Sequence, residues 1–249
     1  MKRFALIGLL LFLWQISYSI FNLNFAIIPS PSQIGVAFLQ LIGSGEAFSN
    51  ILVSLQRVLV GFLLAAMIGV SAALFLGSYK KAGFFVEPLI EILRPIPPIA
   101  WIPIAILLFG LGNTPAYFIV FMGSFFPIFT NTLFGAHSIP KVYKNLSKTL
   151  ELKKSVYFKD ILFKYSLPYI FTGLKIGIGM AWMSVIAAEL IGAQSGLGYF
   201  IQASRLLLQT DQVIVGMILI GLTGYALHWL LTVIEKRVIP WKAEKDVEN

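Results

Sequence analysis

Apolar runs long enough to cross a lipid bilayer recur along this chain of 249 residues. Only 12% of the residues are charged, about half the share of a typical soluble domain, and the mean hydropathy is +0.85. In lipid every backbone polar group needs a partner within the protein, so only helices and closed barrels span membranes. Runs of roughly 20 residues fit helices rather than strands. The sequence therefore predicts an all-α polytopic membrane protein.

Six runs are candidates for transmembrane helices. Residues 4–21 follow Lys2 and Arg3 and fit either a signal peptide or a first membrane helix. We expect an uncleaved helix, because the run exceeds the roughly 7–15 apolar residues of a signal peptide. Residues 22–50 predict an external loop with a surface helix near 34–41. The other runs are residues 51–77, 84–111, 116–134, 168–191 and 213–234, with an amphipathic stretch at 199–210.

Lysine and arginine are concentrated on one side of these six spans. The N-terminus, Lys80 and Lys81, the polar segment 145–168 and the C-terminal tail fall on that side, whereas the opposite side offers only Arg205. Because cytoplasmic flanks carry the excess of basic residues, we expect both termini in the cytoplasm. We also expect a single transmembrane domain over residues 1–249. These flanks explain the net charge of +8, so we expect the lipid bilayer and no nucleic acid as a partner.

The polar segment 145–168 combines lysines with regularly spaced apolar residues, which indicates short amphipathic helices. Our hypothesis is that this segment docks a soluble partner, with Leu146, Leu150 and Leu152 as the buried side and the lysines as the rim. A solvated basic loop that only fixes the topology is the alternative. The lysines are Lys148, Lys153, Lys154, Lys159 and Lys164.

Prolines interrupt the run 84–111 at Pro95, Pro97, Pro98 and Pro103. Proline removes backbone donors, and the freed carbonyls are tolerated at membrane depth only where neighbouring helices or a water-filled path satisfy them. A broken helix therefore indicates a translocation path, although kinks also serve packing.

Few ionisable side chains fall within the runs, where they are costly unless paired or hydrated. Glu87, Glu91 and Arg94 have helical spacing, and Glu91 suits an i, i+3 pair with Arg94 near the inner surface. Arg57 lies near the outer end of its run, where an arginine can snorkel.

The run 168–191 contains both small and ionisable residues. Gly173 and Gly177 form a small-xxx-small pair, which allows close helix approach. Lys175 is within snorkelling reach of the cytoplasmic face. Glu189 lies deep and lacks an obvious local partner, so it is a candidate for substrate gating or for a structural hydrogen bond.

Catalytic and nucleotide-binding motifs are missing from the sequence. There is no cysteine, and His137 and His228 are far apart, with no H-E-x-x-H and no G-x-S-x-G pattern. A Walker A pattern is also missing. We therefore expect no enzyme activity, metal or cofactor in this chain. If it carries out transport powered by ATP, the ATP and its magnesium must be bound by another subunit.

Short stretches along nearly the whole chain resemble a known family. Their order is similar to that of the inner-membrane permease subunit of type I binding-protein-dependent ABC importers. More narrowly, it resembles the nitrate, aliphatic sulfonate, taurine and bicarbonate permeases. The resembling stretches are residues 28–31, 93–97, 101–103, 109–112, 126–132, 188–189, 195–199 and 208–211.

The family's cytoplasmic signature is only partly kept in this sequence. In register with Pro168, Asn145 takes the place of a glutamate, Ser147 that of an alanine and Glu151 that of a glycine. Leu167 and Pro168 match the family plainly.

The resemblance implies that residues at about 136–166 form a coupling helix in a cleft of an ATPase subunit, so that nucleotide-driven closure moves the membrane helices. It also implies a homodimer, because two ATPases call for two docking loops. The expected coupling residues are Asn145, Leu146, Ser147, Leu150, Glu151, Leu152 and Pro168. The path candidates are Arg94, Pro95, Pro97, Pro98, Lys175 and Glu189.

The resemblance implies a small oxyanion such as nitrate, sulfonate, taurine or bicarbonate as cargo, delivered by a periplasmic or lipid-anchored substrate-binding protein. Arg57, Arg94 and Lys175 suit an anion if they face the path. A thiamine-precursor pyrimidine or another small organic molecule is the alternative cargo. The shortage of buried carboxylates argues against an ion-coupled secondary transporter, and an intramembrane enzyme would need a polar constellation that is not visible.

Overall fold

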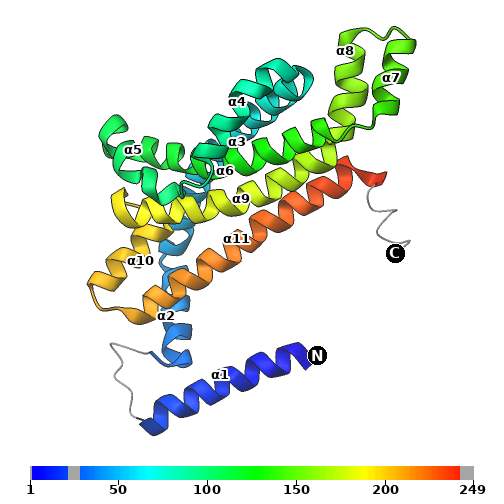
Figure 1. Cartoon of the computed structure of the whole chain (residues 1–249). Coiled ribbons are helices and arrows are strands. Elements are labelled where there is room, and N and C mark those ends of the chain that lie inside the picture. Colours follow the sequence, from blue (N-terminus) through cyan, green and yellow to red (C-terminus); the bar gives the residue numbers. More distant parts are fainter. Residues whose placement is uncertain (1, 22–28, 242–249) are drawn as a thin grey trace. The chain divides into compact units, whose positions relative to one another are not determined.

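Helices form all the regular structure in the described part of the chain, which is residues 2–21 and 29–241 of the computed structural model (Figure 1). No strand occurs among these residues, so the all-α expectation is confirmed. The expected loop residues 22–28 and the tail residues Lys242 and Lys245 lie outside the described residues.

The helical elements follow the predicted order, with different ends. In chain order they are α1 (Lys2–Phe21), α2 (Pro31–Gly43), α3 (Glu46–Ser78), α4 (Lys80–Leu93), η1 (Pro98–Trp101), α5 (Ile102–Phe109), α6 (Asn113–His137), α7 (Lys141–Thr149), α8 (Lys154–Val156), η2 (Tyr157–Phe163), α9 (Lys164–Gly192), α10 (Leu197–Leu206) and α11 (Thr210–Val238). Lys80 and Lys81, which we expected in a turn, begin α4 instead.

The predicted surface helix near 34–41 is α2, and it begins earlier because of a capping box. The side-chain oxygen of Ser30 accepts a hydrogen bond from the Gln33 N–H at 3.3 Å, and the Gln33 side chain accepts one from the Ser30 N–H at 2.8 Å. Pro31 then occupies the first helical position, where a missing N–H costs nothing.

Among the described residues, four helical stretches are long and apolar enough to cross a membrane, namely α3, α6, residues Lys154–Gly192 and α11. A fifth candidate is a pair of helices, Gly83–Leu93 and Pro98–Phe109, bent by 92°. The bend falls at the predicted prolines, so the broken helix is confirmed. The run 4–21 forms α1, whose described apolar part Gly8–Tyr18 is shorter than the other candidates.

Pro168 lies inside a helix, which corrects our expectation that a helix begins there. Helical residues continue from Lys154 to Gly192. A π-helical stretch, η2, precedes α9 and its internal proline. Proline cannot donate to the carbonyl four residues earlier, but membrane helices accommodate it through local π adjustments and neighbouring groups.

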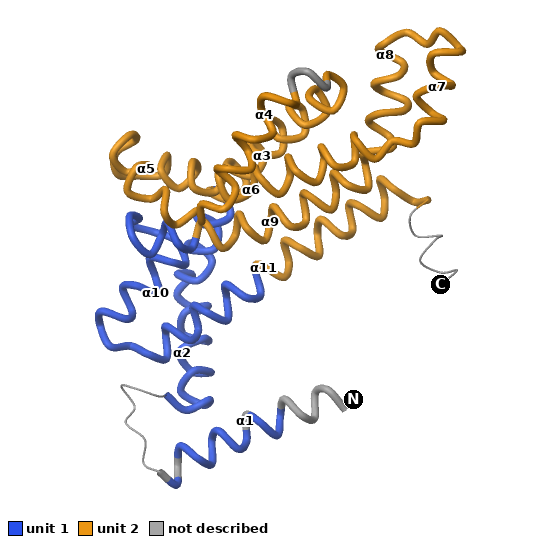
Figure 2. The backbone as a smooth tube through the Cα atoms, in the orientation of Figure 1, with its two compact units in different colours: residues 1–56, 186–223 blue, residues 57–185, 224–249 orange. Residues whose placement is uncertain are grey.

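Figure 2 shows that the chain divides into two compact units. Unit 1 comprises residues 1–56 and 186–223, and unit 2 comprises residues 57–185 and 224–249. The candidate coupling segment and the proline break both belong to unit 2, whereas Glu189 belongs to unit 1.

Glycines allow close helix packing within unit 2. A Cβ atom on Gly177 of α9 would lie 2.8 Å from Cγ1 of Ile128 in α6, and one on Gly173 would lie 3.1 Å from the Cα atom of Ile128. A Cβ on Gly61 of α3 would lie 2.6 Å from Cγ1 of Val120 in α6. The close approach predicted from the Gly173 and Gly177 pair is therefore confirmed.

Candidate coupling surface and substrate path

A helical hairpin extends beyond the ends of α6 and α9 (Figure 1). It consists of α7, a turn at residues 150–153 and α8, which continues into η2. No residue of α7 is buried. The segment that we predicted to dock a partner is thus helical and accessible.

One face of α7 is an exposed apolar stripe. Val142 and Leu146 of α7 and Leu150 at its C-cap recur at i, i+4 and i+8, and they are 71%, 50% and 60% exposed. Side chains at this spacing lie on the same side of a helix. We call these three residues the α7 stripe. Leu152, which we expected on the same side, lies in the turn and is partly buried.

The end of α7 is fixed by a backbone motif. The N–H of Leu152 donates to the carbonyl of Ser147 at 3.0 Å, and the N–H of Glu151 donates to the carbonyl of Lys148 at 3.1 Å. Glu151 has a φ of 45°, in the left-handed region where glycine is favoured after a helix. The resemblance places a glycine at this position. The backbone conformation is therefore compatible with the register in which Asn145 takes the place of the family's glutamate.

The base of the hairpin is anchored in the core of unit 2. Leu162 of η2 is fully buried and packs with Leu74 of α3, Ala136 of α6 and Ile170 of α9. Because packed interiors transmit strain, a displacement of the hairpin would reach these three long helices.

Two cavities in unit 2 share Arg94, the residue that ends α4. Each has a volume of about 240 Å³. The first lies between α4 and α6 and gathers Glu87, Glu91 and His137 around Arg94, with Thr130 beside them. In the described part of the chain no ion pair joins Glu91 to Arg94, so the expected i, i+3 pair does not form.

The second cavity lies between the proline break, α6 and α9. Arg94 and Pro98 line it together with Asn131 and Met180. The amide nitrogen of Asn131 donates to the carbonyl of Pro127 at 2.8 Å, which orients its side chain.

The two remaining proline candidates lie in the break itself. Pro95 and Pro97 are exposed and are not among the described residues that line either cavity. The structure thus brings two of the six path candidates, Arg94 and Pro98, to one cavity.

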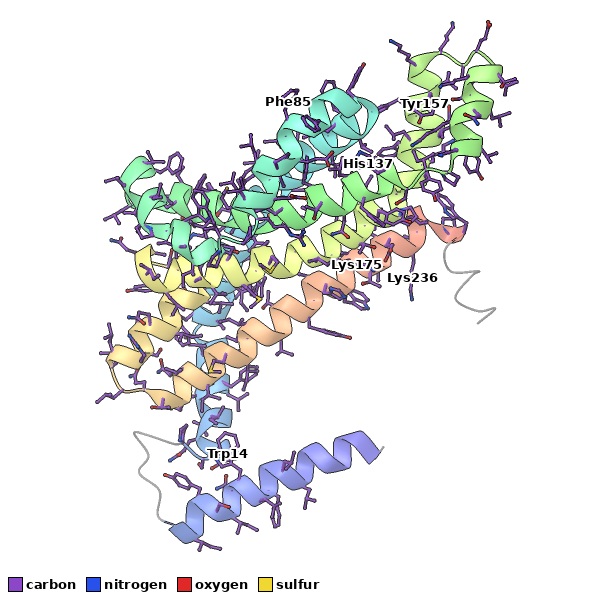
Figure 3. The ribbon with its side chains drawn as sticks, in the orientation of Figure 1. Trp14, Phe85, His137, Tyr157, Lys175 and Lys236 are labelled. Carbon is purple, nitrogen blue, oxygen red and sulfur yellow. The ribbon has the colours of Figure 1, made fainter. Side chains whose placement is uncertain are left out.

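Lys175 forms an ion pair instead of lining either cavity. Its Nζ lies 2.6 Å from Oε2 of Glu235 in α11. Figure 3 shows Lys175 on α9 and Lys236 on the neighbouring part of α11. Glu235 itself is buried, so the pair neutralises a carboxylate within the helix packing.

Glu189 caps the start of α10 within unit 1. The carboxylate is 1% exposed, Oε2 accepts from the Gly198 N–H at 2.9 Å, and Oγ of Ser54 lies 2.9 Å from both carboxylate oxygens. Oγ of Ser54 accepts in turn from the Leu197 N–H at 2.9 Å. Negative charge is favourable at a helix N-terminus, so this geometry fits the structural role rather than substrate gating.

Arg57 is buried, which corrects our expectation that it snorkels. It is 4% exposed, and its Nε donates to Oδ1 of Asn113 at 2.9 Å. Asn113 begins α6, so an internal polar partner replaces the water that snorkelling would provide.

Four residues of these sites were not predicted from the sequence, namely Val142, Asn131, Thr130 and His137. Val142 lies four residues before Leu146, so its spacing was a usable signal. Asn131 belongs to the resembling stretch 126–132. Thr130 belongs to the same stretch, whereas neither spacing nor resemblance indicated that His137 meets α4.

The chain is similar to several known proteins. Residues 61–240 match the family described as binding-protein-dependent transport system inner membrane component. The nitrate import permease protein NrtB of Synechocystis sp. is 37% identical over 94% of this chain and 87% of its own length. A Methanocaldococcus jannaschii protein named as an ABC transporter permease is 39% identical over 82% of this chain and 77% of its own length. The Bacillus subtilis protein SsuC, named for aliphatic sulfonates transport, is 29% identical over 97% of this chain and 88% of its own length.

Proposed function

Because the chain belongs to the binding-protein-dependent transport system inner membrane components, as a type I ABC importer permease of the nitrate and sulfonate group, we propose that it forms the membrane path of an ATP-driven importer for a small oxyanion. The chain is a permease and not an enzyme. Relatives named for nitrate and for aliphatic sulfonates support the cargo class. ATP and magnesium are bound by a separate ATPase subunit.

The observation that carries this proposal is the α7 stripe. Its three side chains are exposed on a lysine-rich helix beyond the ends of α6 and α9 (Figure 1). An apolar stripe with a polar rim is what a helix-in-groove contact requires. The stripe enters a cleft of the ATPase, with Asn145 and Ser147 on the same helix and Glu151 and Leu152 ending it.

The buried base of the hairpin supports a mechanical role. Leu162 packs with residues of α3, α6 and α9, and Pro168 lies six residues further along the same continuous helix. Closure of two ATPase subunits would therefore reach the membrane helices as a rigid-body motion.

The path runs past Arg94. Arg94 and Glu91 are exposed in a segment that is a candidate membrane span, and charged side chains at membrane depth face water or protein. This face therefore borders a hydrated path that a second copy of the chain completes, as a homodimer. Arg94 offers an anion one cationic contact between the two cavities.

The orientation follows the lysine distribution. Both termini and the hairpin lie in the cytoplasm, where positive flanks are favoured. A periplasmic or lipid-anchored substrate-binding protein delivers the cargo to the opposite face. The whole chain acts as one transmembrane domain in a bacterial inner membrane.

The test is co-purification followed by reconstitution. The full chain should copurify with an ABC ATPase, and uptake into liposomes should require the ATPase, ATP and the binding protein. Uptake by the chain alone under an ion gradient would contradict the proposal and favour a secondary transporter. A binding protein that holds a pyrimidine rather than an oxyanion would reject the cargo class alone.

A further inference from the structure

A cavity of about 440 Å³ lies between the end of α3 and the α8 side of the hairpin, and Arg94 does not line it. One wall consists of Phe75 and Ser78 from the last turn of α3 and of Tyr79, which directly follows α3. The rings of Phe75 and Tyr79 lie together with centroids 4.8 Å apart. Oγ of Ser78 donates to the carbonyl of Leu74 at 2.9 Å, so its proton is engaged. This wall is mainly aromatic.

The opposite wall carries the charge. It is formed by Lys154, Ser155 and Tyr157, with Phe158 completing it, and Figure 3 shows Tyr157 in this segment. Lys154 forms no ion pair with any residue that the structure describes. No acidic residue is among the described lining residues. The cavity therefore offers one cation, the hydroxyl of Ser155 and the phenol hydroxyls of Tyr79 and Tyr157.

The cavity lies where a candidate span meets the hairpin. α3 ends at Ser78, and Lys154 begins the continuous helical stretch that leads into α9. Tyrosine is enriched at the membrane–water interface, where its ring meets the headgroups. Basic pockets between membrane helices on the cytoplasmic side bind anionic headgroups.

We propose that this cavity binds the headgroup of an anionic phospholipid. The ammonium of Lys154 contacts the phosphate, and the hydroxyl of Ser155 donates to it. Tyr79 and Tyr157 lie along the glycerol region, and Phe75 faces the acyl chains. Such a lipid would join the end of α3 to the hairpin. The site does not depend on the cargo, and it shares only Lys154 with the expected rim of the ATPase contact.

The test titrates the full chain, purified in its assembled form in detergent, with dioleoyl phosphatidylglycerol or dioleoyl phosphatidylcholine, and bound lipids are counted by native mass spectrometry. Phosphatidylglycerol should be retained preferentially. Lys154→Gln should weaken its binding about fivefold, the size of one lysine–headgroup contact at a membrane surface, whereas Lys154→Arg should keep it. The matched control is Lys159→Gln, because Lys159 is exposed nearby and does not line the cavity.

Three results would overturn the proposal. Equal retention of the two lipids would remove the headgroup selectivity. Equal losses in Lys154→Gln and Lys159→Gln would show diffuse charge attraction instead of a site. Displacement of the lipid by millimolar inorganic phosphate would indicate an anion site that does not need the aromatic walls. Tyr79→Ala, which alters a half-exposed side chain, should also lower phosphatidylglycerol binding while the protein stays assembled.

Discussion

Lys175 and Glu235 form an ion pair between α9 and α11, with Nζ of the lysine 2.6 Å from Oε2 of the glutamate. From the sequence, Lys175 suited an anion in the path. In the structure its charge is engaged by a buried carboxylate in the same unit. Arg94 is therefore the cation that both cavities of unit 2 share.

Removal of the lysine from this pair should destabilise unit 2. Lys175→Met would deprive the buried Glu235 of its cationic partner, at a cost of about 2 kcal/mol, below the range for fully buried pairs because Lys175 is partly exposed. The double variant Lys175→Met with Glu235→Leu should recover most of this loss. Thermal unfolding of all three variants in detergent measures the coupling, and additive losses would contradict a direct interaction.

Glycines on the α6 side of α9 should not tolerate a methyl group. Gly173→Ala would place Cβ 3.1 Å from the Cα of Ile128 and from the Pro127 carbonyl, and such overpacking typically costs about 1–3 kcal/mol. Gly179→Ala in the same helix meets nothing within 4 Å. The unfolding temperature should fall for the first variant and hold or rise for the second, and equal behaviour would argue against the α6–α9 packing.

A glycine at position 151 should stabilise the hairpin. Glu151 has a φ of 45°, which costs a non-glycine residue roughly 1–2 kcal/mol. Glu151→Gly should recover about 1 kcal/mol, whereas Glu151→Ala should not, because alanine bears the same strain. Amide hydrogen exchange across α7 measures the stability of the hairpin in both variants, and it should be slower in Glu151→Gly but not in Glu151→Ala. Slower exchange in the alanine variant would contradict the left-handed backbone at this position.

Loss of the Arg94 charge should slow uptake of an oxyanion. Arg94→Gln removes one charge-assisted contact, so uptake of nitrate or a sulfonate by the reconstituted importer should fall about tenfold, the equivalent of ~1.4 kcal/mol. Arg94→Lys should retain part of the rate. Arg237→Gln, at the exposed end of α11, serves as control. Unchanged uptake in Arg94→Gln would place the path elsewhere.

Local signals in the sequence predicted local structure well. The apolar runs predicted the helices, and the clustered prolines at 95–98 predicted the break, which is a bend of 92°. Several backbone N–H donors are lost in succession there, and a continuous helix cannot accommodate that loss. The prediction that a helix begins at Pro168 was wrong, because one proline can remain inside a helix that carries a π turn.

Partners distant in the chain could not be predicted. Glu189 meets Ser54 across 135 residues of sequence, and Lys175 meets Glu235 across 60. Helical spacing shows which side chains share a face, but it does not show which helix that face meets. For the same reason the cavity between α4 and α6 became visible only in the folded chain, although Glu87, Glu91 and Arg94 were recognised individually.

The central claim is that the α7 stripe is the surface through which an ATPase moves this permease. The most direct measurement is the amount of ATPase that copurifies with Leu150→Asp, compared with Leu111→Asp, which alters another exposed leucine at the opposite end of α6. We predict that Leu150→Asp releases the ATPase while the permease keeps its thermal stability, and that Leu111→Asp retains the ATPase. Full retention of the ATPase by Leu150→Asp would contradict the account.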